Sequence, residues 1–389
     1  MIRKIKFNNF YSFKTEQILD FTANKKTSYS YYNSEFGNQI SKIIGFVGPN
    51  AAGKTNIIRL LSFIGYFITN GDDKQPELSA AFKPFFNNKN VSNITVEFEL
   101  EKTLFFYSFS IKDNLVVKES LEVKSVEKYS RKEKIFDRKS NGFDFLNKKY
   151  IGIAEKNSVD IKPNVSSIVF FNSLSEIKII QTVYKYFSKF KTNINERGHI
   201  NNIENQVSSL RLFLQDPEIA KEINDFISKF DLGLKAFDIR EQTDFNEKKI
   251  LASGVHNING DNTALAFEYE SRGTQLLFFN LVKILYAAKN DAYVVIDELE
   301  YGLHPEAFNK LISYFIDEKL NNSTQLFFSS HSLGFMKILD LHQIFLTEKN
   351  DNCESRVYRL NEVGGIRSDA NYLAKYMSGA YGAFPRIRT

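Results

Sequence analysis

Apolar and polar residues alternate along two stretches of the first 120 residues. From Ile94 to Leu100 every second residue is apolar, and the same period runs from Phe105 to Ile111. A period of two places the apolar side chains on one face of a strand, so both stretches predict half-buried antiparallel strands. Residues 118–144 are charged with only short alternating pieces, which indicates an exposed part of the sheet or long loops.

The apolar spacing then becomes helical. It predicts two or three helices in residues 171–231, on either side of an Asn-rich connector. The apolar positions are Ile180, Val183, Tyr184 and Phe187, then Ile219, Ile223, Phe226 and Phe230. We therefore expect a helical insertion at residues 166–231, within a head formed by residues 1–165 and 232–389.

Strands and helices alternate from residue 264 onward. Residues 293–296 form a continuous apolar run, as expected for a parallel strand covered on both faces, and residues 326–328 form another. Between them His304 and Pro305 open a helix, and proline suits a first helical turn. With the antiparallel strands upstream, the pattern predicts an α/β fold.

Composition and charge change this picture little. Of 389 residues, 43% are hydrophobic and 25% are charged, as in an ordinary globular protein. Cys353 is the single cysteine, so no internal disulfide can form, which suits a reducing cytosol. There is no apolar run of membrane-spanning length and no secretion signal, so we expect a cytoplasmic protein without a membrane partner. A formal net charge of +5 permits a nucleic-acid partner without demonstrating one.

Residues 48–55, Gly-Pro-Asn-Ala-Ala-Gly-Lys-Thr, match the phosphate-loop pattern G-x-x-x-x-G-K-[ST]. An apolar strand precedes the loop and an apolar helical face follows it, which is the context that such a loop requires. Backbone N–H groups would wrap phosphate, Lys54 would reach the β- and γ-phosphates, and Thr55 would bind Mg²⁺. The predicted ATP contacts are Gly48, Asn50, Ala51, Ala52, Gly53, Lys54, Thr55 and Asn56.

Two carboxylates, Asp297 and Glu298, directly follow the apolar strand at residues 293–296. Ligands bind at the carboxyl ends of parallel strands, so this pair should lie beside the phosphate loop. Asp297 could hold Mg²⁺ through water, and Glu298 could act as the general base that polarises the attacking water. The alternative is a pair that only caps the next helix, and the phosphate loop in the same chain favours the catalytic interpretation.

The order of the remaining motifs suggests a family. Ser271, Gly273 and Thr274 begin a very apolar helix shortly before the Asp-Glu strand, and His331 follows the strand at 326–328. Ser-x-Gly alone is a common helix cap. In the order phosphate loop, insertion, Ser-x-Gly, Asp-Glu and histidine, however, the chain resembles ABC-type ATPase heads of the structural-maintenance-of-chromosomes (SMC) and DNA-repair class.

This resemblance implies an ABC-type head, with a parallel-sheet phosphate-loop core and an antiparallel β lobe. It also implies a homodimer joined through ATP, while a higher oligomer stays open. Ser271, Gly273 and Thr274 of one subunit would cover the γ-phosphate bound by the other, and His331 would sense that phosphate. Residues 301–304 would be the loop that crosses the dimer interface.

Further motifs are similar to ABC-like AAA-family ATPases of bacterial anti-phage and abortive-infection loci, relatives of the OLD ATPases. They are the opening Phe7-Asn8-Asn9-Phe10-Tyr11-Ser12-Phe13, the Ser-x-Gly-Thr form, Leu303-His304-Pro305 after Asp-Glu-Leu, and the ending Gly379-Ala380-Tyr381-Gly382-Ala383-Phe384-Pro385. Tyr11 replaces a common arginine. OLD nucleases carry a metal-dependent nuclease domain, for which this sequence offers no acidic cluster. We therefore expect a sensor or regulatory ATPase that controls a separate effector, a nuclease or toxin.

The main alternative is a RecF- or SMC-like repair ATPase that acts directly on DNA. The candidate DNA contacts are Lys128, Arg131, Lys132, Lys134, Arg138 and Lys139. Acidic neighbours dilute this charge, which favours an ordinary solvated face. A transporter ATPase subunit fits less well, because the long insertion and the Ser-x-Gly-Thr form depart from transporter heads, and a non-enzymatic scaffold would show no ATP turnover.

Overall fold

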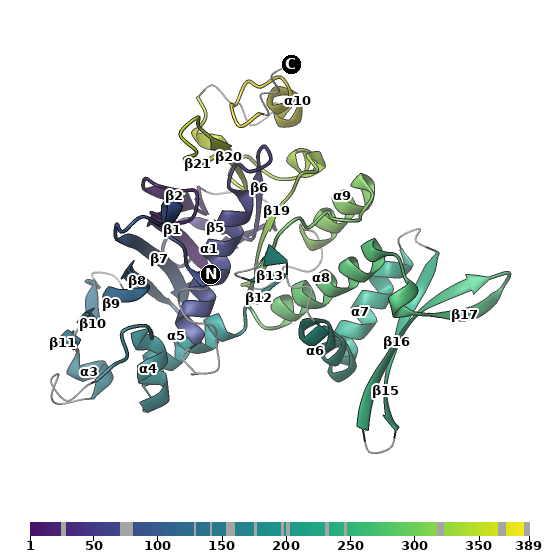
Figure 1. Ribbon diagram of the computed structural model, residues 1–389, viewed down its shortest axis with the longest axis horizontal. Coiled ribbons are helices and arrows are strands. Elements are labelled where there is room, and N and C mark those ends of the chain that lie inside the picture. Colours follow the sequence, from purple (N-terminus) through teal and green to yellow (C-terminus); the bar gives the residue numbers. More distant parts are fainter. Residues whose placement is uncertain are drawn as a thin grey trace.

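The structure is a computed structural model that describes residues 1–24, 29–70, 81–127, 130–140, 142–152, 160–174, 177–195, 198–199, 203–229, 233–244, 247–316, 323–364 and 371–384. Two large sheets form its framework (Figure 1). One has the strand order β12-β18-β19-β6-β20-β21 and is parallel except for its edge strand β21. The other, with the order β11-β10-β9-β8-β7-β1-β2, is antiparallel throughout.

The strands are β1 Ile2–Asn8, β2 Gln17–Asp20, β3 Thr22–Ala23, β4 Tyr31–Asn33, β5 Gln39–Ser41, β6 Ile43–Val47, β7 Ser92–Leu100, β8 Thr103–Lys112, β9 Leu115–Ser125, β10 Glu133–Lys139, β11 Gly142–Leu146, β12 Lys191–Thr192, β13 Ile194–Asn195, β14 Gly198–His199, β15 Leu234–Asp244, β16 Glu247–Ile258, β17 Asp261–Ala266, β18 Tyr293–Ile296, β19 Gln325–Ser329, β20 Ile344–Lys349 and β21 Ser355–Arg359. The helices are α1 Lys54–Thr69, α3 Lys148–Ile151, α4 Ser167–Leu174, α5 Lys178–Ser188, α6 Ile203–Gln215, α7 Pro217–Ser228, α8 Arg272–Lys289, α9 Pro305–Tyr314 and α10 Tyr372–Met377.

The parallel sheet divides the apolar core into two layers, because successive side chains of a strand point to opposite faces. On β6, Ile44 and Phe46 belong to the layer that contains α1 and the antiparallel sheet. Ile43 and Val47 belong to the layer that contains α8 and α9. All these side chains are buried, so the strands between the layers are apolar on both faces, as the sequence predicted.

The antiparallel strands predicted around residues 94–111 are confirmed as β7 and β8. Val96 lies opposite Tyr107, Phe98 lies opposite Phe105, and all four side chains are buried. The alternation breaks at Glu99, which is buried because it forms an ion pair with Arg3 at 2.9 Å. Strands β9, β10 and β11 continue this sheet within residues 118–144, so the predicted sheet is confirmed and the alternative of long loops is wrong. The expected exposure is only half right, because each of these strands also has buried residues.

The predicted basic cluster is not a uniform exposed face. Arg138 is fully buried in an ion pair with Glu119, so its assignment to an exposed cluster is wrong. Lys134 and Lys139 pair with Asp137 and Asp144 at 2.6 Å each. Among the other candidates, Lys132 lies over the ring of Phe106 and Lys128 falls outside the described residues. These pairings favour an ordinary surface over a DNA contact.

The predicted insertion contains α4, α5, α6 and α7, where two or three helices were expected. Helices α4 and α5 contact α1, whereas α6 and α7 contact α8. The buried apolar residues follow the predicted spacing in both groups, although Tyr184 is only partly buried and Phe230 lies outside the described residues. The limits of the insertion, residues 166–231, stay a prediction.

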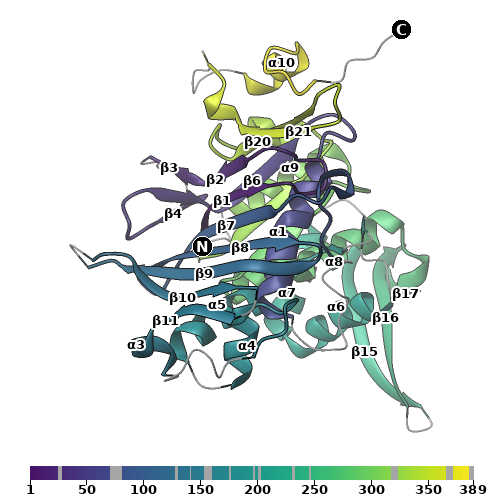
Figure 2. The same ribbon diagram turned by 60° about the vertical axis from the view of Figure 1, so that its left-hand side comes forward.

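A three-stranded antiparallel sheet, β15-β16-β17, projects from one side of the molecule in both views (Figures 1 and 2). The sequence pattern did not predict this sheet. Only part of β15 is buried, through Leu234, Phe237 and Ile239, and every residue of β17 is exposed. Exposed strands lack the apolar alternation by which a strand is predicted. In the described part of the chain, no helix has the combination of length and apolar character needed to cross a membrane.

Candidate active site

The phosphate loop joins β6 to α1, and two of its glycines pass very close to neighbouring residues. A Cβ atom at Gly48 would lie 2.2 Å from the carbonyl oxygen of Thr347 on β20. At Gly53, which has a φ of 112°, it would lie 2.8 Å from Ser355 Oγ. Real Cβ atoms do not approach other atoms this closely, so a side chain at either position would displace the loop.

The tip of the loop is open, while its end is anchored. Asn50 and Ala51 are exposed, and Ala51 has a left-handed φ of 60°. Ala52 is buried. Asn56, in the first turn of α1, donates a hydrogen bond to Ser12 Oγ at 2.8 Å. An open loop with a fixed backbone before a helix N-terminus suits the binding of phosphate by backbone N–H groups.

Lys54 is buried and its ammonium group folds back into the phosphate loop. Nζ donates hydrogen bonds to the carbonyl oxygens of Gly48 at 2.8 Å and Pro49 at 3.0 Å. Burial lowers the pKa of Lys54, while nearby carboxylates, led by Asp297, act in the opposite direction. A phosphate at this position would offset the cost of keeping the charged form away from water, so the environment of Lys54 fits an anionic ligand.

Thr55 and Asp297, the two predicted Mg²⁺ ligands, meet at the carboxyl end of β18. Thr55 Oγ1 donates a hydrogen bond to Asp297 Oδ2 at 3.0 Å. Neighbouring ligands on an octahedral Mg²⁺ ion, each about 2.1 Å from the metal, are about 3 Å apart. The spacing of these two oxygens therefore fits direct binding of one shared ion by both, whereas the sequence prediction was that Asp297 holds the ion through water. Phosphate and water commonly fill the remaining positions of such an ion.

Glu298 and His331 also lie together, at the ends of the adjacent strands β18 and β19. Glu298 Oε1 is 3.8 Å from His331 Nε2. Glu298 has a φ of 50°, a conformation that is uncommon for a residue other than glycine and that clusters at functional sites. The N–H of His331 donates a hydrogen bond to Glu300 Oε1. The predicted base and the predicted γ-phosphate sensor are thus neighbours.

Ser329 and Asn193, which the sequence analysis did not single out, hold the Asp-Glu pair. Ser329 Oγ donates to Asp297 Oδ1 and accepts from the N–H of Glu298, the latter at 2.9 Å. Asn193 Oδ1 accepts from the N–H of Asp297 at 2.8 Å, and its Nδ2 donates to the Asp297 carbonyl at 2.9 Å. Ser329 could have been identified from the sequence, because it is a polar residue at the end of a buried apolar strand. Asn193 could not, because it is one of several asparagines in an Asn-rich connector.

The Ser-x-Gly element lies at the start of α8, as predicted. Ser271 Oγ accepts a hydrogen bond from the N–H of Thr274 at 3.1 Å, which is an ordinary helix cap. Gly273 packs against Gly302 so closely that a Cβ at Gly273 would lie 2.3 Å from the Gly302 carbonyl oxygen. The two elements that the resemblance assigns to a dimer interface, residues 271–274 and 301–304, are therefore joined within one chain.

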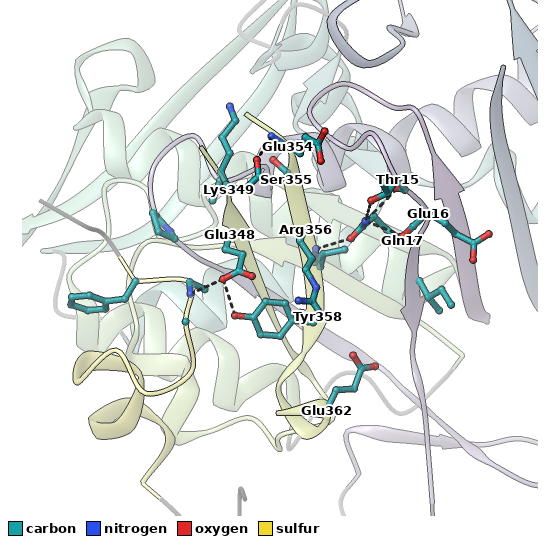
Figure 3. A pocket seen from close by; sticks show the side chains of 18 of the residues that line it. Thr15, Glu16, Gln17, Glu348, Lys349, Glu354, Ser355, Arg356, Tyr358 and Glu362 are labelled. Carbon is teal, nitrogen blue, oxygen red and sulfur yellow. Dashed lines mark hydrogen bonds between the residues drawn. The ribbon is translucent and has the colours of Figure 1, made fainter. Parts of the chain in front are cut away.

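A cavity of about 1570 Å³ is lined by residues of the phosphate loop, β2 and the β20–β21 hairpin, and Figure 3 shows side chains of its lining. Pro49, Asn50 and Ala52 line one wall, and the β20–β21 hairpin lines another. In this hairpin the Tyr358 hydroxyl donates to the carbonyl of Tyr381 at 2.7 Å. The segment after α10 is thereby held against the cavity. In the parallel sheet, β6 and β19 lie between β20, which lines this cavity, and β18, which the Asp-Glu pair follows.

Residues 43–337 match the family described as "AAA domain, putative AbiEii toxin, Type IV TA system". The chain belongs to this family. The match contains the phosphate loop, the Asp-Glu pair, the Ser-x-Gly element and His331. A comparison with curated proteins gave no match.

Solved SMC heads resemble this member of the AAA-domain family in fold. The "SmcHead bound to the C-winged helix domain of ScpA" has a TM-score of 0.52 at 12% identity, over 94% of this chain and 99% of that chain. The "SMC head domain from Thermotoga maritima" has a TM-score of 0.44 at 13% identity, over 92% and 98%. The fold is that of an ABC-type ATPase head, as the sequence predicted, and the family is one of AAA-type ATPase domains.

Proposed function

We propose that the protein is an ATP-binding and ATP-hydrolysing switch in which two copies enclose each ATP·Mg²⁺. The observation that carries this proposal is the convergence of Lys54, Thr55, Asp297, Glu298 and His331 at the carboxyl ends of β6, β18 and β19. These strands are neighbours in the parallel sheet, where ligands of open α/β sheets bind.

Each residue has a definite task in this reaction. Lys54 and the loop N–H groups bind the β- and γ-phosphates. Thr55 and Asp297 would hold Mg²⁺, which would supply positive charge to offset that of the phosphates. Glu298 accepts a proton from the attacking water, and His331 responds to the γ-phosphate. The proximity of Glu298 to His331, 3.8 Å between side-chain atoms, supports assigning both to the γ-phosphate.

The cavity beside the loop is the candidate position of the nucleoside. Asp297, Glu298 and His331 lie on the β19 side of β6, so the γ-phosphate would lie on that side too. The other end of an extended triphosphate then leaves on the β20 side, where the cavity begins at Pro49 and Asn50. The polar lining from β20 and β21 is compatible with a base and ribose.

The start of α8 and the loop at residues 301–304 would complete the site of a second copy. The contact between Gly273 and Gly302 presents them as one surface. Tyr269, which precedes this surface in sequence, and Tyr301, which belongs to it, are 71% and 53% exposed. Tyrosine is enriched at protein interfaces, and a helix N-terminus favours an anion, so this surface suits both a partner subunit and its γ-phosphate.

Gly273→Ala should weaken turnover more than nucleotide binding. The added methyl group would meet the Gly302 carbonyl, and overpacking of this kind costs about 1–3 kcal/mol. We expect ATP turnover to fall about tenfold or more, while the affinity for a fluorescent ATP analogue, which the phosphate loop mainly binds, stays within about twofold. Gly364→Ala is the control, because its Cβ would enter open space. Equal turnover in both variants would exclude a role for this contact.

The switch is proposed to act in an anti-phage defence system, as the sensor or regulator of a separate effector protein. The family description, which names a toxin–antitoxin system, supports a conflict role. DNA is a second candidate partner, although the pairing of Lys134 and Lys139 with acidic residues speaks against the basic cluster as its contact. Turnover stimulated several-fold by DNA alone would favour the repair alternative.

Lys54→Ala tests whether the phosphate loop binds ATP, on which the rest of the proposal depends. Removal of the buried ammonium should abolish the binding of ATP at concentrations that saturate the wild-type protein, and with it all turnover. Calorimetric titration with ATP·Mg²⁺ and phosphate release measure the two effects. Lys337→Ala, in the turn that follows β19, is the control. Turnover that survives in Lys54→Ala would contradict the site, and a wild-type protein without turnover would leave only a binding role.

A further inference from the structure

The side-chain amide of Asn193 continues the hydrogen-bond pattern of the parallel sheet beyond the end of β12. It directly follows β12, the two-residue edge strand that pairs with β18. At Asn193 the side-chain amide replaces the backbone in this pairing, because Oδ1 accepts from Asp297 N at 2.8 Å and Nδ2 donates to Asp297 O at 2.9 Å. The amide therefore acts as an additional peptide group beside the end of β18.

These bonds fix two successive peptide groups. The N–H of Asp297 belongs to the peptide group that enters the residue, and its carbonyl belongs to the group that leads to Glu298. The N–H of this second group donates to Ser329 Oγ at 2.9 Å. Asn193 and Ser329 thus hold opposite ends of the same peptide group. This group precedes the left-handed backbone of Glu298, which persists only where its surroundings support it.

We infer that Asn193 is a positioning residue for the Mg²⁺-dependent step, an inference that rests on the proposed function. It sets the direction of the Asp297 carboxylate toward Thr55 and of Glu298 toward the γ-phosphate. It acts through the backbone of Asp297, to which both ends of its side-chain amide bond. Residues that orient metal ligands typically change metal affinity or activity by about 10–100-fold when they are removed.

A substitution at the neighbouring Thr192 distinguishes the proposed role of Asn193 from a general anchoring of the connector. Its hydroxyl lies 3.0 Å from Ser62 Oγ on α1 and accepts a hydrogen bond from the N–H of Ile194 at 3.2 Å. Thr192→Val keeps the shape of the side chain and removes these bonds, but it leaves the amide of Asn193 in place. This variant therefore reports what loosening the same segment does on its own.

The test compares Asn193→Ala, Asn193→Gln and Thr192→Val in the full chain, beginning without nucleotide. Hydrogen–deuterium exchange of a peptide spanning residues 293–300 should be at least about fivefold faster in Asn193→Ala, because the N–H of Asp297 loses its acceptor. In Thr192→Val it should match the wild type. Asn193→Gln retains the amide one methylene farther out, so we expect intermediate exchange.

The second measurement is the dependence on Mg²⁺. In Asn193→Ala we expect the affinity for ATP in EDTA to be unchanged, the Mg²⁺ concentration for half-maximal turnover to rise about tenfold, and kcat to fall about tenfold. Thr192→Val should keep the wild-type Mg²⁺ dependence even if its Tm falls. Wild-type exchange and Mg²⁺ dependence in Asn193→Ala, or the same changes in Thr192→Val, would overturn the inference.

The failure of the proposed function is distinguishable from these outcomes. If the wild-type protein binds ATP without hydrolysing it, the Mg²⁺-dependent gain in ATP affinity replaces turnover as the readout, and its loss in Asn193→Ala supports the inference. If the wild-type protein binds no ATP, both the proposed function and the role of Asn193 are overturned, whatever the exchange data show.

Discussion

Glu298→Gln should bind ATP as well as the wild-type protein and hydrolyse it about 10²–10⁴-fold more slowly, the usual contribution of a general base. Glutamine has nearly the same shape but does not accept the proton. Because hydrolysis is what would reopen the closed state, this variant should accumulate dimers in ATP·Mg²⁺. Phosphate release and light scattering coupled to gel filtration measure the two effects.

Glu306→Gln is the matched control for this experiment. Glu306 lies exposed in the first turn of α9, only a few residues from Glu298, and its substitution makes the same change in charge. We expect wild-type turnover and wild-type assembly from it. A Glu298→Gln protein that stays monomeric with and without ATP would contradict the shared site, and one with normal turnover would exclude Glu298 as the base.

Arg138→Met should destabilise the protein by about 3–5 kcal/mol, the cost of leaving a buried charge without its partner. Glu119 is fully buried and accepts hydrogen bonds from the Tyr107 hydroxyl at 2.7 Å and from Ser167. Arg138 NH1 lies 3.2 Å from its carboxylate and is itself buried. Chemical denaturation should measure this loss, and Lys139→Met, an exposed neighbour, should cost less than about 1 kcal/mol.

The loss of stability in Arg138→Met should also depend on pH. Burial raises the pKa of Glu119, and Arg138 opposes that rise, so the pKa should be higher still in Arg138→Met. Stability that depends on a protonated Glu119 is complete below the pKa of the unfolded state and is lost as pH rises through the raised folded pKa. The deficit of the variant should therefore shrink on acidification. A deficit independent of pH, or one that adding Glu119→Gln does not reduce, would exclude the unpaired carboxylate as its cause.

The parts of the site that the sequence predicted are those whose signal is local. The phosphate loop and the Asp-Glu pair each follow a buried apolar strand within a few residues. One short stretch of sequence therefore predicts both the reactive residues and the strand that positions them. The sequence order of Ser271, Asp297 and His331 added the family resemblance. The geometry then brings Thr55 to Asp297 and Glu298 to His331, contacts that the sequence implies only through these roles.

What the sequence did not predict depends on contacts between distant residues. Asn193 bonds to Asp297, which is 104 positions away, and Ser329 bonds to Asp297 from 32 positions away. Neither an asparagine nor a serine in a sequence indicates such a distant partner. Arg138 was misassigned because a charged residue in a charged stretch is normally solvated, whereas here Glu119, 19 positions away, pairs with it in the interior. The β15–β17 sheet was not predicted, because β17 has no buried face and therefore no need for an apolar residue at every second position.

The placement of helices α4 to α7 against two different layers has a mechanical consequence. Helices α4 and α5 rest on α1, which begins with Lys54 and Thr55, whereas α6 and α7 rest on α8, which Ser271 caps. A partner protein that pulled α4 and α5 relative to α6 and α7 would tilt α1 against α8, the helix proposed to complete the site of a second copy. Force applied to these helices would therefore act on the phosphate-binding helix and on the Ser-x-Gly element at the same time.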